Sequence, residues 1–310
     1  MKGHKLAAFW AKAKRWAPVY LMLLPGAVYL IINNYIPMFG LVVAFKQYNV
    51  RDGIFGSKNI GLKNFTFLFR SSDSWVAIRN TLLYNFTFIM VTLIVAVTLA
   101  ILIHEITSKR ARSFFQSTVL LPYLFSITII SYMVYAFLGT DSGFINNTIF
   151  SLLHIDPINW YSTQKYWPWI LLIVNTWKSV GYSCLIYIAA IDGIDTQLIE
   201  AAKLDGANKW QQIQNIVFPA LVPSVITLTM LHIGKIFYSD FGLFYQVPMN
   251  SGILTEVTQT MDTYVYRMLV NVGNIGMSSA ACVVQSIVGL VMILLANMAV
   301  RKWSRENALF

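Results

Sequence analysis

Three polar side chains are predicted to share one face of an apolar helix. Asn175, Lys178 and Tyr182 stand at positions i, i+3 and i+7, which lie on the same side of an α-helix. Their amide, amine and phenol groups can hydrogen-bond hydroxyl groups, and aromatic rings nearby can stack on apolar ring faces, as a sugar site requires. Such side chains can instead hydrogen-bond between neighbouring membrane helices. Both interpretations stay open for each residue.

A second group of candidate residues lies in a polar stretch, residues 191–219, between two apolar segments. Asp195 is positioned to cap a short helix, and Gly206 predicts a turn or a close backbone approach. A short projecting helix with small residues and an acid suits docking into a groove of another protein. A mere connector would need far fewer residues. The acids, the small residues and the glycine concerned are Glu200, Ala201, Ala202, Asp205 and Gly206.

The end of the same stretch predicts a second helix. Trp210, Ile213 and Ile216 recur every three residues and give this helix an apolar side. Pro219 is expected to begin the next membrane span, where a missing amide hydrogen costs little. The stretch therefore predicts a helix–turn–helix outside the membrane.

Several kinds of chemistry have no residues to support them. The sequence contains neither a phosphate-binding Gly-x-x-x-x-Gly-Lys-[Ser/Thr] loop nor His-Glu-x-x-His, and its four histidines are scattered. We therefore predict no catalytic residues, no metal site and no nucleotide bound by this chain. The predicted spans also lack internal Asp and Glu, which argues against an ion-coupled transporter. Lys178 and Lys235 are the cationic exceptions, and each could line a pathway, snorkel or pair with a neighbour.

The elements that must position these residues are membrane spans. Of the 310 residues, 57% are hydrophobic and 12% charged, whereas soluble domains carry about 25% charged residues. Apolar runs approach the roughly 20 residues that cross a bilayer, so the chain is predicted to be an all-α polytopic membrane protein. A kink is expected near Pro37 in the first span. The six expected spans are 17–45, 78–104, 113–138, 168–190, 220–238 and 275–300.

Charge distribution predicts the orientation of these spans. Residues 1–16 form an expected amphipathic N-terminal helix, and 17–310 a single six-helix domain. Six spans place both termini and the 191–219 loop on one side, which carries 13 Lys and Arg residues against 6 on the other. The positive-inside rule makes that side the cytoplasm. Because the net charge of +10 sits at span ends, nucleic-acid binding is not expected.

The loop resembles a known motif. Glu200-Ala201-Ala202, three residues, Gly206, nine residues and Ile216-x-Phe218-Pro219 closely resemble the EAA motif of binding-protein-dependent ABC importer permeases. The family has Leu where this chain has Phe218. Length, span number and loop position agree, so the resemblance covers essentially the whole chain and implies the type I ABC importer permease fold.

Other segments are similar to a narrower group. The chain resembles maltose-type carbohydrate-uptake permeases and, within them, the lipo-oligosaccharide/polysaccharide-type subunits of Gram-positive bacteria. The segments that carry this likeness are 35–49, from Tyr35-Ile-Pro37 to Gln-Tyr48-Asn49, then Gly61-Leu-Lys-Asn64-Phe65 and Asp262-Thr-Tyr264-Val-Tyr266-Arg267.

The resemblance implies a division of labour. This non-catalytic subunit would pair with a second, homologous permease, and two ATPase subunits would bind ATP and Mg²⁺. An extracellular substrate-binding lipoprotein would deliver a carbohydrate, such as an oligosaccharide. The loop would be the coupling helix, in which Glu200 makes polar contacts, Ala201 and Ala202 fit the ATPase cleft and Gly206 makes the turn. A stand-alone transporter or a glycan- or lipid-processing membrane enzyme remains the alternative.

Overall fold

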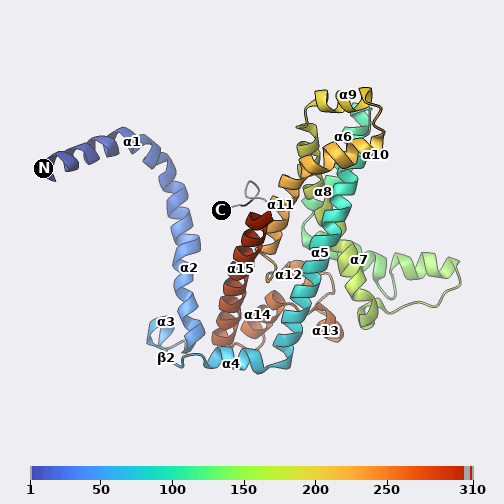
Figure 1. The fold of residues 1–310 in the computed structure, drawn as a ribbon. Helices are drawn as coiled ribbons and strands as arrows, with labels where there is room; N and C mark the ends of the chain where they lie inside the picture. Colours follow the sequence, from blue (N-terminus) through green and yellow to red (C-terminus); the bar gives the residue numbers. More distant parts are fainter. Residues whose placement is uncertain (1, 304–307, 309–310) are drawn as a thin grey trace. The chain divides into compact units, whose positions relative to one another are not determined.

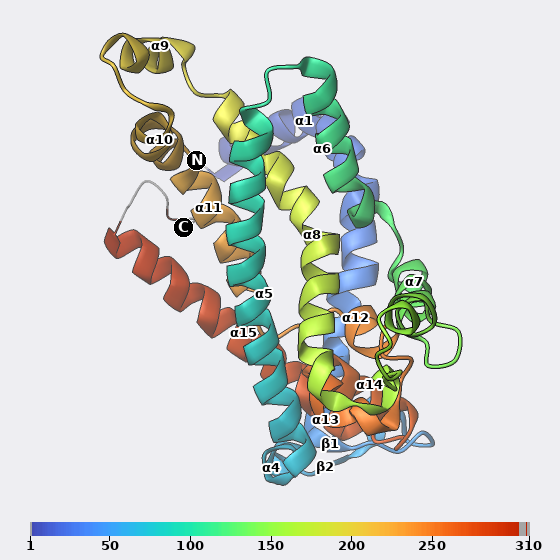
Figure 2. The same cartoon turned by 90° about the vertical axis from the view of Figure 1, so that its right-hand side faces the viewer.

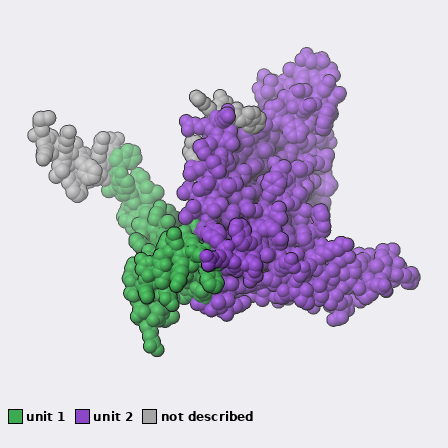
Figure 3. Space-filling model, turned by 60° about the horizontal axis from the view of Figure 1, so that its bottom comes forward, with its two compact units in different colours: residues 1–68, 274–283 green, residues 69–273, 284–310 purple. Residues whose placement is uncertain are grey.

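The computed structural model describes residues 2–303 and 308, with side chains for 16–302 and 308. Within these residues the chain is helical apart from turns, irregular connections and one short antiparallel sheet, in which Lys46 of β1 (Lys46–Gln47) pairs with Asn59 of β2 (Lys58–Asn59) (Figure 1). Two compact units, coloured separately in Figure 3, are described in turn. One comprises residues 1–68 and 274–283, and the other comprises residues 69–273 and 284–310.

Five helical stretches in the described residues are long and apolar enough to cross a membrane. They are Trp16–Phe45, Ser72–His104, Gln164–Asp192, Lys209–Ile233 and Ile275–Lys302. A sixth span is obtained if the bent pair Lys109–Leu124 and Ile127–Leu138 counts as one. The predicted all-α membrane architecture is thus confirmed, with five or six spans according to that pair.

The first unit begins with one long helix, α1 (Lys2–Leu30). The backbone thus runs without a break from the expected amphipathic helix of residues 1–16 into the first span. The predicted apolar stripe of that amphipathic helix concerns side chains that lie outside the described residues. The interruption expected near Pro37 is a π-helical turn, Ile31–Tyr35, followed by α2 (Ile36–Met38) and a 3-10 helix, Phe39–Phe45. Because Pro37 has no amide hydrogen for the carbonyl of Asn33, the regular helix ladder cannot continue there.

The rest of this unit surrounds the small sheet. Asn64 Nδ2, on α4 (Lys63–Arg70), donates to the carbonyl oxygens of Ala44 at 2.8 Å and Lys46 at 3.1 Å. A Cβ at Gly276 would lie 2.7 Å from the same Nδ2 atom, so only glycine allows this close approach. A short helix, α3 (Gly53–Gly56), lies between the two strands.

The second unit is built on α8 (Trp167–Asp192), which packs against α5 (Ser72–His104), α6 (Lys109–Leu124) and α11 (Phe218–Ile233) (Figure 2). Its remaining helices are α7 (Ile127–Leu138), α9 (Thr196–Leu204), α10 (Lys209–Gln212), α12 (Phe241–Tyr245), α13 (Thr255–Thr258), α14 (Met261–Val270) and the later part of α15 (Ile275–Trp303). Short π or 3-10 turns occupy Ile145–Phe150, Trp160–Ser162, Gln164–Tyr166, Ile213–Val217 and Gly252–Leu254.

Two apolar clusters hold α8 in place. Near its end, Cys184 and Ile188 pack with Ala96 and Ala100 of α5 and Leu221 of α11. Near its start, the buried Trp167 and Leu171 pack with Phe88, Ile130, Leu243 and Phe244. Small residues on α5 let the helix backbones approach closely, as in other membrane bundles. The part of α8 between the two clusters is thereby fixed against its neighbours.

Two expected boundaries are wrong. The span predicted over 113–138 is broken: α6 ends at Leu124, and α7 continues at a bend of 97°. Phe125 and Ser126 are extended, and the Ser126 hydroxyl accepts a hydrogen bond from the Ile129 amide, which starts a new helix. The span predicted over 220–238 ends at Ile233 and begins as early as Lys209, because α10 runs through a π-helical turn into α11.

Candidate functional site

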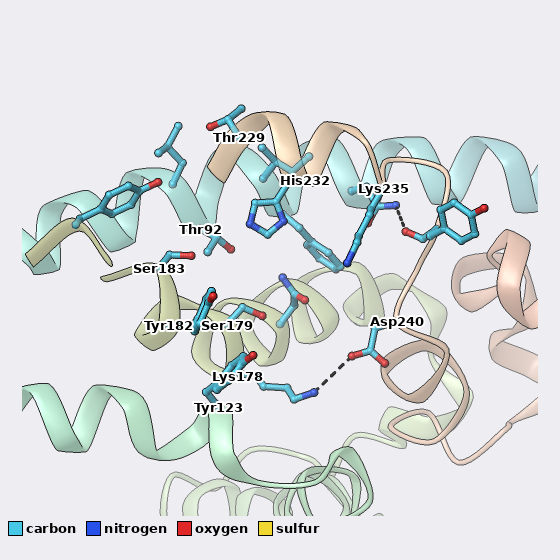
Figure 4. A pocket seen from close by; sticks show the side chains of 17 residues that line it. Thr92, Tyr123, Lys178, Ser179, Tyr182, Ser183, Thr229, His232, Lys235 and Asp240 are labelled. Carbon is cyan, nitrogen blue, oxygen red and sulfur yellow. Dashed lines mark hydrogen bonds and ion pairs between the residues drawn. The ribbon is translucent and has the colours of Figure 1, made fainter. Parts of the chain in front are cut away.

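A cavity of about 540 Å³ opens among the helices of the second unit (Figure 4). Its volume lies within the range of about 300–1,000 Å³ found for small-molecule sites. Its walls come from α5, α6, α8, α11 and the segment that follows α11. The lining residues besides those discussed below are Phe88, Ile89, Thr92, Leu93, Ser183, Tyr187, Thr229 and Tyr238.

The polar stripe predicted on α8 faces this cavity. Asn175, Lys178 and Tyr182 all line it, and Ser179, one turn of helix away from Asn175, joins them. The structure therefore brings the three predicted residues together around one space. Lys178 stands at the midpoint of the Gln164–Asp192 span, where a charged group is costly unless it faces a cavity or a partner.

Charged groups enter the cavity from two further directions. His232 of α11 and Lys235 just after it line the wall across from Ser179 and Tyr182 (Figure 4). Asp240 lines it beside Lys178, whose Nζ lies 3.5 Å from Asp240 Oδ2. The sequence singled out Lys178 and Lys235 as possible pathway residues but did not predict that they face the same cavity, and it did not predict His232 or Asp240 there. Residues some 60 positions apart have no helical spacing to relate them.

An aromatic pair forms another part of the wall. Tyr123 of α6 stacks on Tyr182 of α8, with ring centroids 5.1 Å apart and planes inclined by 19°. Both rings are about half exposed, 45% and 48%, so each has a face or edge available for a bound molecule. Tyr123 was not predicted, since it lies in a separate helix whose position only the fold determines.

The segment that carries Lys235 and Asp240 is held by side chains from three places. Asn85 Nδ2 on α5 donates to the carbonyl oxygens of Ile236 at 2.7 Å and Tyr238 at 2.8 Å. Gln285 Nε2 on α15 donates to the carbonyl oxygen of Phe237 at 2.9 Å. These side chains provide hydrogen-bond donors for backbone carbonyl groups that have no helical partner, and they hold this part of the cavity wall in position.

The Asp262–Arg267 segment contributes to the same support. Asp262 Oδ2 accepts hydrogen bonds from the amide (2.5 Å) and the hydroxyl (2.9 Å) of Ser239, the residue before Asp240. Arg267, on the same helix α14, donates to Gln259 Oε1 at 3.0 Å. Burial lowers the pKa of the Arg267 guanidinium from its ordinary value. Asp262 and Arg267 thus act as positioning residues for the connection between α11 and α15.

The predicted partner-contact loop projects from the other end of α8. Asp195 caps α9 as expected, its carboxylate accepting a hydrogen bond from the Gln197 amide at 2.9 Å. None of the nine residues of α9 is buried. Leu204, its last residue, is 90% exposed, and Trp210 on α10 is 66% exposed. An exposed helix with large apolar side chains is typical of a surface that another protein covers.

The five predicted loop residues lie together on and after α9. Glu200, Ala201, Asp205 and Gly206 are exposed, and Ala202 is half-buried. Gly206 has the expected turn geometry, with φ of +81° in the left-handed region that glycine adopts readily. The second helix of the predicted helix–turn–helix begins as α10, but it is not separate from the membrane span as predicted, because it continues into the helical stretch Lys209–Ile233.

Ionic contacts tie both ends of this loop to the connection between α5 and α6. Asp192, the last residue of α8, accepts from Arg112 Nη2 at 2.5 and 2.6 Å and lies 3.0 Å from His104 Nδ1. After the loop, Lys209 Nζ lies 2.5 Å from Glu105 Oε2. We name these two contacts the loop tethers. They flank α9 and join the segments before and after it to α5 and α6, which also line the cavity.

Comparison with known proteins identifies relatives of the whole chain. The model of the family described as "Binding-protein-dependent transport system inner membrane component" matches residues 89–305. The polygalacturonan/rhamnogalacturonan transport system permease protein YteP of Bacillus subtilis is 32% identical over 93% of this chain and 89% of its own. The probable starch degradation products transport system permease protein AmyD of Thermoanaerobacterium thermosulfurigenes is 32% identical over 87% of this chain and 89% of its own.

A solved structure agrees with both sequence matches. A chain of a bacterial ABC transporter that imports the acidic polysaccharide alginate superposes with a TM-score of 0.87 at 31% identity, covering 96% of this chain and 99% of that one. The same transporter has been solved with an alginate pentasaccharide-bound periplasmic protein. The match extends over essentially the full length of both chains.

Proposed function

Because this chain belongs to the family of binding-protein-dependent transport system inner membrane components, we propose that it forms half of the pathway of an ATP-driven carbohydrate importer. It is a multi-pass membrane permease rather than an enzyme. The transported molecule is a saccharide such as an oligosaccharide, by analogy with the relatives. A second, homologous permease completes the pathway, and an external binding protein delivers the sugar, as a periplasmic protein does for the alginate transporter.

The observation that carries the proposal is the connection between the cavity and the loop. The exposed helix α9 lies between the two loop tethers, which bind the end of α8 and the start of α10 to residues at the facing ends of α5 and α6. Helices α5, α6 and α8 bear Asn85, Tyr123 and Lys178 at the cavity. A force applied to α9 therefore reaches the cavity walls through packed helices and charge-assisted hydrogen bonds.

The source of that force is a pair of partner ATPase subunits, which bind the ATP and Mg²⁺. Glu200, Ala201, Ala202, Asp205 and Gly206 form the surface that enters an ATPase groove. Closure of the ATPases on ATP moves α9 and opens the cavity outward, and hydrolysis resets it inward. This assignment puts the loop on the cytoplasmic side, where the Lys and Arg distribution also places it.

The simplest test of the proposed function is assembly and import by the complete transporter. The chain, co-expressed with its permease, ATPase and binding-protein partners, is expected to purify as a complex that takes up saccharide only with ATP. A folded chain that purifies without any ATPase subunit, or uptake that is indifferent to ATP, would contradict the proposal.

Lys178→Ala is expected to change the apparent affinity or the rate of saccharide uptake several-fold, because the ammonium group faces the cavity. Uptake of an oligosaccharide panel into proteoliposomes measures this effect. Lys165→Ala is the matched control, since Lys165 is exposed outside the cavity beside the Tyr166 ring. Equal uptake profiles for all panel members in the Lys178 variant and the wild type would remove Lys178 from the pathway.

Asp192→Asn is expected to weaken coupling while the ATPases stay attached. The change removes the charge that holds Arg112 and His104, but leaves α9 and its exposed residues intact. Because Asp192 is partly exposed, each contact is worth little by itself, about 0–1 kcal/mol. The expected result is a several-fold rise in ATP hydrolysed per saccharide imported. Asp195→Asn, which keeps the helix cap, should show the wild-type ratio, and an unchanged ratio in Asp192→Asn would show that this tether transmits nothing.

A further inference from the structure

The cavity has more positive than negative charge, which bears on the class of saccharide that it accepts. Two lysines and one aspartate line it, together with His232. Lys235 makes no ion pair among the residues that the structure describes. Its side chain is exposed and lines the cavity, so the ammonium group is accessible to a bound molecule. An anionic group bound in the cavity would supply the opposite charge that Lys235 lacks among these residues.

The one acid present neutralises Lys178 only loosely. The distance of 3.5 Å between Lys178 Nζ and Asp240 Oδ2 exceeds the 2.7–2.9 Å of a strong ammonium–carboxylate hydrogen bond. The Asp240 side chain is 45% exposed, so water competes for its charge. Its other oxygen, Oδ1, accepts a hydrogen bond from the Leu243 amide at 3.2 Å and caps α12. Asp240 therefore has a structural role that it keeps when Lys178 turns away.

Resting on the proposed function, we propose that the cavity is a carboxylate-binding site for acidic, uronate-type saccharides, in which a ligand carboxylate replaces Asp240 as the partner of Lys178. Lys235 binds a second carboxylate or the same one from the opposite wall (Figure 4). Asn175, Ser179 and the Tyr123–Tyr182 pair contact hydroxyl groups and ring faces, which are common to neutral and acidic sugars. The two lysines thus discriminate acidic from neutral saccharides, and the other residues provide affinity for both kinds.

Asp240 gives the site its reversibility. With a resident carboxylate, Lys178 is never left without a partner when the saccharide leaves, so release in the empty cavity does not expose a bare charge. At Lys178, exchange of one carboxylate for another keeps one ionic partner throughout. A transport site requires such a balance, because a ligand that is held too tightly is not released.

The test uses the assembled transporter, with its partner permease and ATPases but without the binding protein, so that the binding protein contributes no selectivity. Trigalacturonate and its carboxyl-reduced neutral trisaccharide are titrated by calorimetry at low ionic strength. Trigalacturonate is expected to bind at least tenfold more tightly. Lys178→Gln and Lys235→Gln should each weaken trigalacturonate binding by about tenfold and weaken binding of the neutral trisaccharide much less, whereas Lys165→Gln should alter neither.

Asp240→Asn distinguishes carboxylate exchange from a purely structural ion pair. Asparagine preserves the cap of α12, because its side-chain oxygen still accepts from the Leu243 amide. Removal of the competing charge is expected to tighten trigalacturonate binding several-fold, the opposite of the lysine variants. Weaker trigalacturonate binding in Asp240→Asn would overturn the exchange.

Other outcomes separate this proposal from the proposed function. Equal affinity for both trisaccharides, binding of neither, or equal losses for both in the lysine variants would overturn the carboxylate site. The transporter with its binding protein is therefore tested in parallel for import of a saccharide panel. Import that persists while the charge effects are absent leaves the proposed function standing, and absence of all import contradicts the proposed function itself.

Discussion

A subunit that carries Gly206→Trp is expected to insert into the membrane and to import no saccharide. Gly206 is exposed after α9 and has φ of +81°, and a Cβ at this position would meet no atom within 4 Å. The first atom of a side chain is therefore not obstructed by its own subunit, and the control variants account for the strain of a positive φ. The expected loss arises because the indole would fill the space that an ATPase groove must occupy. Uptake should fall to background, and less ATPase should co-purify.

Two variants separate obstruction of a partner from backbone strain. Gly206→Asn keeps a residue that tolerates the left-handed region and should retain much of the import. Gly273→Trp introduces the same side chain at another exposed glycine with positive φ, +68°, and open surroundings, in a different connection. It should leave ATPase attachment intact. Normal import by Gly206→Trp would rule out the coupling-helix assignment.

Gly181→Ala is expected to produce the largest loss of stability from a single methyl group. A Cβ at Gly181 on α8 would lie 2.1 Å from the carbonyl oxygen of Val119 and 2.8 Å from the Cα of Leu120 on α6. Both are backbone atoms, so α6 and α8 must separate to admit it. Overpacking costs about 1–3 kcal/mol where side chains can adjust, and separation of two backbones should cost at least the upper end.

The measurement is the thermal unfolding of the purified transporter, together with the yield of folded subunit in the membrane. Gly26→Ala is the matched control, because Gly26 also lies within a helix and a Cβ there would meet nothing within 4 Å. Its transition should stay near that of the wild type. A transition in Gly181→Ala equal to that of the control would show that α6 and α8 do not approach this closely. The same contact brings Tyr123 and Tyr182 together, so saccharide binding should also decline.

Local patterns were sufficient to predict most of the membrane architecture. Runs of apolar residues identified the spans, because a helix that crosses the lipid needs about 20 mostly apolar residues regardless of which helices pack against it. The bend between α6 and α7 escaped prediction because Phe125 and Ser126 are compatible with a helix. The break depends on a single side-chain cap, which composition does not reveal.

The structure of the loop could also be predicted, because its helix cap and its turn depend on residues close together in the sequence. Asp195 caps α9, Gly206 makes the turn, and the small residues Ala201 and Ala202 lie between them. Only the end of the loop was misjudged, where a π-helical turn lets α10 continue into the span. The loop tethers could not be foreseen, since Asp192 and Arg112 are 80 residues apart and neither lies in a recognisable pattern.

The sequence by itself determined the class of molecule, the spans, the exposed loop and one polar face of α8, all of which depend on residues close together in the chain. The tertiary structure decided what that face meets. It placed Lys235 and Asp240 opposite and beside Lys178, and it brought Tyr123 onto Tyr182. A cavity is made by helices whose packing depends on small contacts such as that at Gly181, and the charges around it are therefore a property of the fold.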